Sequence, residues 1–521
     1  MRVWLRLRIA LSTGPGMLLN PCIMKPASRP LPRRAFIAST ATLTAATLAG
    51  GRMARALAAE AAGTRQATGT KVGEVTDSTA IVWTRLTAAT TRNNEGVVVA
   101  PRPKKAKKQD KAEKKEAPTE LPPVAKLEGA CPGAAGRIRV RYGTKADLGD
   151  AKVTDWMDVT EANDFIHQFA LSGLKPATVY HYETETTGPG GAPKHGTFRG
   201  RFETAPRPDA PGNFRFCVMT CQGYQDRGHP DGHPIYPSML QLAPQFVAFT
   251  GDNVYYDSNE PAAVSPALAR FHWERMFSLP RQRELLRNVS SYFEKDDHDT
   301  LDNDSWPGKK AGELTWAEGQ RIYRQQVPMG ESTYRTYRWG RDLQIWLTEG
   351  RDFRSPNNRP DGPDKTIWGR EQKEWFKRTV KESNATWRIL ISPTPLVGPD
   401  RGNKNDNHAN TGFTYEGDEL RAWLQANAPD NFFILCGDRH WQYHSVHPQT
   451  GVTEFSVGPA SDEHASGSPG EDKTYHRFHR VKGGFLTVTL KRAGNTSRIL
   501  FEHRDVNGNT VYEWSKERPV A

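Results

Sequence analysis

After residue 213 the chain alternates between short runs of consecutive apolar residues and longer stretches with helical periodicity. Apolar runs that do not alternate with polar residues are typical of strands buried on both faces of a sheet. Such runs predict strands at residues 214–220, 246–250, 342–347, 387–392 and 431–436. Helical stretches between them, such as 369–383 and 417–428, predict an α/β domain over residues 213–505. Residues 506–521 are expected to form a C-terminal tail.

Residues 66–205 follow a different pattern, which predicts an all-β domain. In residues 137–142, charged and apolar residues alternate at period two, as in a half-buried strand. Residues 71–85 predict two short strands around a turn. The pattern Leu-x-Pro-x-Thr-x-Tyr at residues 174–180 resembles fibronectin type III modules, where the tyrosine closes a corner of the sandwich. We therefore predict a fibronectin-like β-sandwich over residues 66–205.

A segment rich in Lys, Ala, Pro and Glu interrupts this domain at residues 100–127. Its composition predicts a solvated, disordered loop; the alternative is a basic tether for membranes or polyanions. Residues 102–116 carry a net charge of +5, and residues 1–58 carry nine Lys or Arg and no acid. Subtracting both from the total of +12 leaves −2 for the remainder. The basic balance is therefore no argument for nucleic-acid binding, and we expect no specific binding of this kind.

Residues 1–58 have the order of parts found in a secretory leader. Arg33-Arg34-Ala35-Phe36 precedes a mildly apolar, uncharged stretch over 38–51, and Ala56-Leu57-Ala58 supplies a small-x-small cleavage site. Paired arginines followed by Phe resemble the twin-arginine export signal, although an anchor helix or a chance Arg pair is the alternative. We predict export by the twin-arginine translocation machinery to the periplasm or outside the cell. No later uncharged apolar run is long enough to predict a transmembrane segment in the mature chain.

Candidate metal ligands follow the predicted strands or lie in polar loops. They are Cys221, Asp252, Tyr255, Asp297, His298, Asn303, Asp438 and His440. Taken singly, Asp252 is as well explained by a turn or helix cap, His440 by a satisfied core histidine, and the acidic loop 296–304 by solvation. Because strand carboxyl ends meet at one edge of an α/β sheet, their joint placement predicts a metal site there. Carboxylates favour hard cations, whereas thiolate and phenolate suit ferric iron or zinc.

These residues stand in motifs that resemble the alkaline phosphatase D (PhoD-like) metallophosphatases over about residues 66–505. The matching motifs are Cys221-Gln222, Gly251-Asp252-Asn-Val-Tyr255, Asp296-Asp297-His298-Asp299 followed by Asn303, Glu349-Gly350-Arg351-Asp-Phe-Arg354 and Gly437-Asp438-Arg-His440. Glu349 stands where the family usually has Asp, and an unusual loop at 226–233 follows Gly223, so the chain resembles a divergent side branch. The resemblance implies a calcineurin-like four-layer α/β/β/α sandwich preceded by a fibronectin type III-like β-sandwich.

The resemblance also implies a cluster of Fe³⁺ and Ca²⁺ ions. Cys221 and Tyr255 would bind Fe³⁺ as thiolate and phenolate, and Asp252 would bridge the metals. Asn303 would offer a carbonyl oxygen to a calcium-type ion. Asp438 and His440 would complete the cluster.

Three further residues receive roles from the resemblance. Asp297 would be a further ligand or would orient His298. His298 would donate a hydrogen bond or a proton to the leaving oxygen. Arg351 would clamp phosphate oxygens, and its alternative is an ion pair with a nearby Asp.

The sequence thus predicts an exported metal-dependent phosphoesterase that hydrolyses phosphomonoesters, phosphodiesters or both. One alternative is a phospholipase D-like phosphodiesterase acting on lipid headgroups or cell-wall polymers. Another is a pseudo-enzyme that binds extracellular phosphates or glycans. Metal content separates the last alternative from the others, because a binding module need hold no stoichiometric metal.

Overall fold

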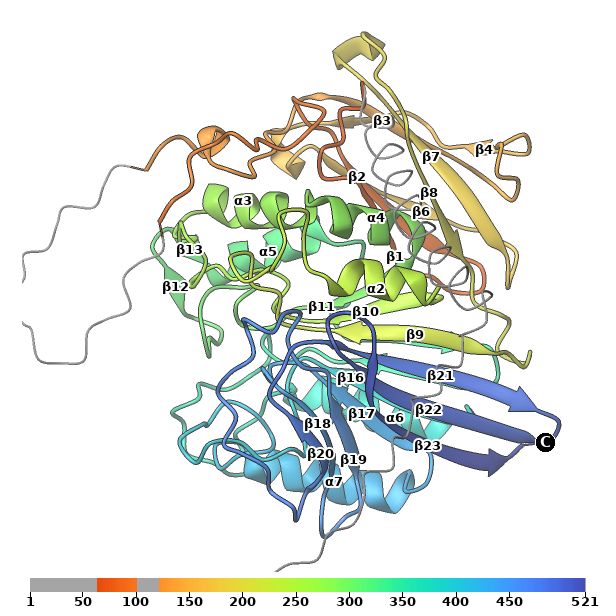
Figure 1. Cartoon of the computed structure of the whole chain (residues 1–521), viewed down its shortest axis with the longest axis vertical. Helices are drawn as coiled ribbons and strands as arrows, with labels where there is room; N and C mark the ends of the chain where they lie inside the picture. The colour runs from red at the N-terminus through yellow and green to blue at the C-terminus, as the bar shows by residue number, and fades with distance from the viewer. Residues whose placement is uncertain (1–62, 101–120, 521) are drawn as a thin grey trace, which may run out of the picture. The chain divides into compact units, whose positions relative to one another are not determined.

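The computed structural model describes residues 63–100 and 121–520. The predicted leader at 1–58 and most of the Lys-rich insert therefore lie outside the described residues. Two large sheets dominate the fold (Figure 1). No helix among the described residues combines the length and apolar character that a membrane crossing needs.

Neighbouring strands in each sheet often come from distant parts of the chain. In spatial order, the nine-stranded sheet comprises β23 (Thr510–Pro519), β22 (Thr496–Arg504), β21 (Phe485–Ala493), β9 (Phe214–Met219), β10 (Phe246–Thr250), β11 (Ser290–Glu294), β1 (Thr70–Gly73), β2 (Ala80–Arg85) and β6 (Ile166–Leu171). The seven-stranded sheet comprises, in the same manner, β14 (Arg335–Trp339), β15 (Leu343–Leu347), β16 (Trp387–Ser392), β17 (Phe432–Cys436), β19 (Thr453–Ser456), β18 (Gln442–Val446) and β20 (His476–Arg480). The five-stranded sheet comprises β4 (Lys152–Val153), β3 (Gly136–Gly143), β7 (Val179–Thr187) and β8 (Phe198–Glu203), with β5 (Met157–Val159) paired to β3. A small hairpin pairs β12 (Lys310–Ala311) with β13 (Leu314–Thr315).

The described residues contain α-helices and short 3₁₀ turns. The α-helices are α2 (Ile235–Gln241), α3 (Pro266–Phe277), α4 (Pro280–Asn288), α5 (Trp316–Gln326), α6 (Gly369–Glu382) and α7 (Thr414–Asn427), and the short 3₁₀ turns are η1 (Val124–Lys126), η2 (Glu161–Asn163) and η3 (Pro189–Gly191). The stretches predicted as helical at 369–383 and 417–428 correspond to α6 and α7, and α7 begins three residues earlier than expected.

The two large sheets pack face to face, and helices cover their outer faces. On β9, Phe216 and Val218 join a core shared with β16 and β17 of the other sheet. Cys217 and Met219, which point the opposite way, pack with residues of α2, α3, α4 and α5. A third core joins α6 and α7 to the far side of the seven-stranded sheet. Burial on both faces explains why these strands read as continuous apolar runs.

The N-terminal strands are joined to one of the large sheets. The five-stranded sheet packs against β1, β2 and β6 in one apolar core. Those three strands also continue the nine-stranded sheet, because β1 pairs in parallel with β11 at Gly73 and Ser291. One layer of the predicted N-terminal sandwich is therefore shared with the nine-stranded sheet. The boundary expected near residue 205 stays a prediction. The predicted tyrosine corner is present: the Lys175 N–H donates to Tyr180 Oη at 2.9 Å.

Two segments for which no regular elements were predicted contain ordered residues. The predicted tail contains β23, which pairs with β22 along its length. Tyr512 and Trp514 are two residues apart, so their side chains lie on the same face of the strand. Trp514 packs against the core between the two large sheets. The described end of the insert, residues 121–127, is also ordered, because Leu127 is buried and the Val97 N–H donates to Lys126 O at 2.8 Å.

Candidate metal centre

Three predicted ligands occupy the same strained position relative to their strands. Cys221, Asp252 and Asp438 each lie two residues beyond the end of β9, β10 or β17. Their φ angles are 50°, 52° and 63°, in the left-handed region. Such a conformation costs a residue with a side chain on the order of 1–3 kcal/mol and persists where the surroundings impose it. We infer that packing at the strand ends fixes where these side chains point.

The site lies where the two large sheets meet, and not on the edge of a single sheet as predicted. β9 and β10 belong to the nine-stranded sheet, whereas β17 belongs to the seven-stranded sheet. Gly437 permits this approach, because a Cβ there would lie 2.6 Å from Thr250 O and 2.8 Å from Thr220 Oγ1. Gly251 has φ of 93°, and its Cβ would lie 2.6 Å from Asp296 Cβ. The glycines of both G-D motifs therefore serve close packing between strand ends.

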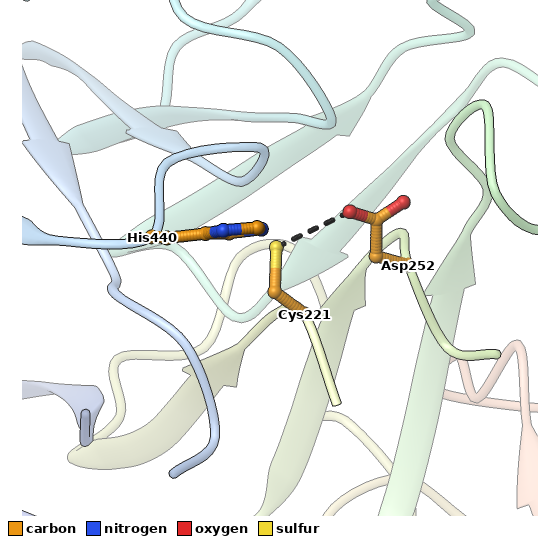
Figure 2. A group of neighbouring side chains, drawn as sticks. All are labelled: Cys221, Asp252 and His440. Atoms are coloured by element: carbon orange, nitrogen blue, oxygen red, sulfur yellow. Dashed lines mark hydrogen bonds between the residues drawn. The ribbon is translucent and has the colours of Figure 1, made fainter. Parts of the chain in front are cut away.

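Four of the predicted ligands converge on one buried point. Cys221 Sγ lies 3.3 Å from Asp252 Oδ2, and Tyr255 Oη lies 3.1 Å from the same oxygen. His440 Nε2 approaches Tyr255 Oη at 3.4 Å. Figure 2 shows the imidazole of His440 and the carboxylate of Asp252 on either side of the Cys221 sulfur. The sulfur, carboxylate and imidazole ligand atoms lie within 4.8 Å of one another.

The electrostatics of this point favour a bound cation. Burial, followed by the charge of Asp252, raises the pKa of Cys221 well above its usual value. Burial raises the pKa of Asp252 to about 8, and Asp297, Asp299 and Asp438 add to the shift while His298 opposes it. Asp252 Oδ1 is buried without a hydrogen-bond partner among the described residues. The thiol of Cys221, the carboxylate of Asp252, the phenol of Tyr255 and the imidazole of His440 form a donor set that fits iron or zinc.

A second group adjoins the first through Asp252. Ligand atoms of Asp252, Asp297 and His298 lie within 4.8 Å of one another, and the rings of Tyr255 and His298 are 4.4 Å apart. Burial tends to lower the pKa of His298, but Asp297, Asp252 and Asp257 raise it well above its usual value. A cationic imidazole beside the predicted ligands would be able to donate a proton.

A carboxylate outside the predicted set orients His298. Asp257 Oδ1 lies 2.6 Å from His298 Nδ1, so Asp257, and not Asp297, takes the orienting role. Asp257 follows Tyr255 by two residues, which is the one sequence signal that marked it. Asp297 instead lies 3.5 Å from Arg351 Nη2, which leaves it the alternative role of a further ligand.

Arg351 forms an ion pair with nearby aspartates, which is the alternative that the sequence left open beside the role of a phosphate clamp. Its guanidinium is fully buried and contacts Asp296 through Nε and Asp297 through Nη2. The role as a phosphate clamp stays a prediction. Glu349, the departure from the family motif, binds Lys295 Nζ at 3.1 Å.

Two predicted ligands are placed less directly. Asn303 is exposed, and its backbone N–H donates to Asp257 Oδ2 at 3.0 Å. Asp438 Oδ2 accepts a hydrogen bond from Arg439 at 3.0 Å and belongs to neither of the metal-ligand groups found among the described residues. Burial raises the pKa of Asp438 to about 6, and Asp406 adds to this while Arg439 opposes it. Their ligand roles stay predictions.

Comparison with known proteins places this geometry in a known family. Residues 216–494 match the sequence profile of the PhoD-like phosphatase family, and residues 52–206 match that of the PhoD-like phosphatase N-terminal domain. Alkaline phosphatase D of Bacillus subtilis (strain 168) is 22% identical over 357 residues. That alignment spans 58% of this chain and 58% of the relative, so less than two thirds of the relative's length is matched.

Two solved structures share the fold. A structure of PhoD superimposes with a TM-score of 0.65 at 14% identity, covering 88% of this chain and 91% of the other. A purple acid phosphatase from yellow lupin (Lupinus luteus) seeds superimposes with a TM-score of 0.57 at 13% identity, covering 86% and 73%. At these identities the likeness establishes the arrangement of the elements.

Proposed function

The chain belongs to the PhoD-like phosphatase family, and from this premise we propose that it is an exported, metal-dependent phosphoesterase. Its substrates are phosphomonoesters, phosphodiesters or both. The observation that carries the proposal is the convergence of Cys221, Asp252, Tyr255 and His440 on one buried point. We also propose that the packed layers are the calcineurin-like α/β/β/α sandwich, and that the N-terminal strands are its fibronectin type III-like companion.

We propose that these residues hold a resident cluster of iron and calcium. Cys221, Tyr255 and His440 would hold Fe³⁺, and Asp252 would bridge to a second ion that Asp297, Asn303 and Asp438 help to hold. When bound, such ions supply Lewis acidity toward the phosphoryl oxygens and lower the pKa of water. A thiolate and a phenolate favour the ferric ion, and oxygen ligands favour calcium.

The chain's own residues supply the rest of the chemistry. His298 holds a proton that it can give to the leaving oxygen. Asp257 fixes the orientation of that imidazole by accepting from Nδ1, which leaves Nε2 to face the substrate. Arg351 neutralises Asp296 and Asp297, so the acidic loop can remain buried beside the centre.

A metal assay coupled to a hydrolysis screen tests the proposal. The purified mature protein is analysed for metal content and assayed on nitrophenyl phosphate, bis(nitrophenyl) phosphate and phosphatidylcholine vesicles. Stoichiometric metal with turnover of either nitrophenyl ester supports the proposal. Turnover of the vesicles alone supports the phospholipase D-like alternative, and metal-free protein without turnover supports a binding module.

Export is a separate part of the proposal. It is supported by the paired arginines, the apolar stretch and the cleavage motif of residues 1–58. Replacing Arg33 and Arg34 with lysine should retain the protein in the cytoplasm, and fractionation followed by immunoblotting measures this. Unchanged export of the double variant would contradict the twin-arginine route.

A further inference from the structure

An imidazole outside the predicted ligand set contacts the phenol oxygen of Tyr255, and a carboxylate in turn contacts that imidazole. His464 Nε2 lies 2.9 Å from Tyr255 Oη, and His464 Nδ1 lies 2.8 Å from Asp226 Oδ2. A carboxylate at Nδ1 holds the hydrogen on that nitrogen and turns Nε2 toward the phenol. The result is a chain of hydrogen bonds that runs from a carboxylate through an imidazole to a predicted metal ligand.

His464 is fixed in place by segments that also carry predicted ligands. The Ser466 N–H donates to His440 O at 3.2 Å, and the Ala460 N–H donates to Cys221 O at 3.2 Å. The His464 ring lies 4.3 Å from the His440 ring and 4.9 Å from the Tyr255 ring. The loop that holds His464 is therefore tied at both ends to the backbone of the metal centre.

Asp226, the partner of His464, comes from the unusual loop 226–233. His233 anchors this loop, because its Nε2 lies 3.0 Å from Gly223 O and its side chain is fully buried. Gly223 leaves room for the pair: a Cβ there would lie 2.9 Å from Asp226 Oδ2 and 3.0 Å from His464 Nδ1. Glycine at 223 and the loop after it, both departures from the family motif, thus serve the same contact.

We propose that His464, oriented by Asp226, is a positioning residue that holds the Tyr255 oxygen where the metal binds. Among the described residues, His464 is not in either group whose ligand atoms lie within 4.8 Å of one another, so it acts through Tyr255. Imidazoles and carboxylates that support a metal ligand typically contribute about 10- to 100-fold to metal affinity or activity. The inference rests on the metal site of the proposed function and adds to it two residues outside the ligand set.

The test measures metal binding and not turnover alone. Metal-free protein is titrated with Fe³⁺ against a competing chelator, and the melting temperature is measured without metal. We expect His464→Ala to lose about 10- to 100-fold in Fe³⁺ affinity with the melting temperature of the metal-free protein unchanged. His464→Gln, which keeps a polar atom able to reach Tyr255, should recover part of the affinity, and Asp226→Ala should give a smaller loss.

The chain offers a matched control in a second histidine–tyrosine pair. His444 Nδ1 lies 2.8 Å from Tyr512 Oη, and His444 is buried against Phe455. His444→Ala should lower the melting temperature and leave Fe³⁺ affinity at the wild-type value. Wild-type Fe³⁺ affinity in His464→Ala would overturn this inference but not the proposed function. A loss of affinity in His464→Ala accompanied by a lower melting temperature, with no recovery of affinity in His464→Gln, would overturn it as well. A wild-type protein that binds no metal would overturn the proposed function with it.

Discussion

Asp257 Oδ1 lies 2.6 Å from His298 Nδ1, so the imidazole at the centre has a carboxylate partner outside the predicted set. Asp257 also accepts the backbone N–H of Asn303 through its other oxygen. One carboxylate therefore fixes both the His298 ring and the start of the loop that follows it. The pair leaves Nε2 of His298 as the nitrogen from which a proton can reach a substrate.

His298→Gln should slow esters with poor leaving groups far more than esters with good ones. An alkoxide needs a proton as it departs, and general acid catalysis of this kind contributes about 10²–10⁴-fold, whereas a nitrophenolate departs without one. The ratio of kcat on an alkyl phosphate to kcat on nitrophenyl phosphate measures the effect. Asp257→Ala should shift this ratio in the same direction by a smaller factor, and an equal loss on both substrates would contradict the role as an acid.

Asp252→Asn should abolish hydrolysis and leave the fold intact. The substitution keeps the shape of the side chain but removes its charge and one of its two anionic oxygens. Changes in residues that only support a metal ligand cost about 10- to 100-fold, so the loss of a bridging ligand should exceed that. Circular dichroism and kcat measure the two effects, and Asp158→Asn, at an exposed position, is the control. Near wild-type turnover in folded Asp252→Asn protein is the contrary outcome.

Chelation should inactivate the enzyme, and Fe³⁺ with Ca²⁺ should restore it better than Zn²⁺ or Mg²⁺. The reason is the combination of a thiol and a phenol with carboxylate oxygens around Asp252. A purple or brown colour from a charge-transfer band should return together with activity. Colourless, fully active protein that contains only zinc would contradict the iron assignment and leave the phosphoesterase assignment standing.

Deleting residues 102–120 should leave activity on small soluble esters unchanged. The two sides of the insert are already joined, because the Val97 N–H donates to Lys126 O at 2.8 Å and the Glu128 N–H donates to Val97 O at 3.0 Å. Shortening a loop whose ends are fixed in this way alters its closure entropy only slightly. Turnover of nitrophenyl phosphate tests this, and lost turnover would show that the insert reaches the active site. Weaker activity on anionic polymers alone, fading as salt rises, would identify it as a tether.

The free energy of unfolding should fall as pH drops below about 6.5, partly because of His503. Burial lowers the pKa of this histidine to about 4, and its Nε2 donates to Ser456 O at 2.9 Å. Between the two pKa values the unfolded chain binds a proton that the folded chain excludes, so stability rises with pH in this window. From these values His503 should contribute about 2 kcal/mol of the loss between about pH 7 and pH 5.

Denaturant unfolding of His503→Gln at about pH 7 and pH 5 measures that contribution. Glutamine can keep the hydrogen bond to Ser456 without the titrating group, so the variant should lose about 2 kcal/mol less than the wild type over this interval. An identical pH dependence in both proteins would contradict the assignment. The lost stability should return when the pH is raised again.

Residue patterns predicted the elements that carry the centre but not all the contacts around it. The apolar runs at 214–220, 246–250 and 431–436 are β9, β10 and β17, because burial on both faces leaves a pattern that sequence shows directly. Asp257 was missed because nothing in a single carboxylate reveals which imidazole it will face. His464 was missed for a related reason, since it meets Asp226 only after more than 200 intervening residues have folded.

The pattern of polar and apolar positions did not predict one strand, and a motif left one role open. Thr510–Pro519 lies in the predicted tail but forms an edge strand, on whose half-buried face Tyr512 and Trp514 are followed by Lys516 and Arg518. The motif around Arg351 implies contact with substrate, and the structure shows the ion pair with Asp296 and Asp297 that the sequence left open as the alternative. The role of Arg351 toward phosphate stays a prediction. Charge at a motif position does not distinguish a group that meets solvent from one that neutralises its neighbours.

The nine-stranded sheet contains strands from residues 70–85 and from residues 485–519. It can therefore be completed only late in synthesis. β1 near residue 70 pairs with β11 near residue 291, and β21, at residues 485–493, pairs with β9, at residues 214–219. Pairings this distant in sequence form slowly, and the sheet cannot be completed before the last strands leave the ribosome. A route that threads unfolded polypeptide would postpone its assembly to the far side of the membrane. The proposed twin-arginine route, which carries folded proteins, would instead let the sheet close and its metals be chosen in the cytoplasm.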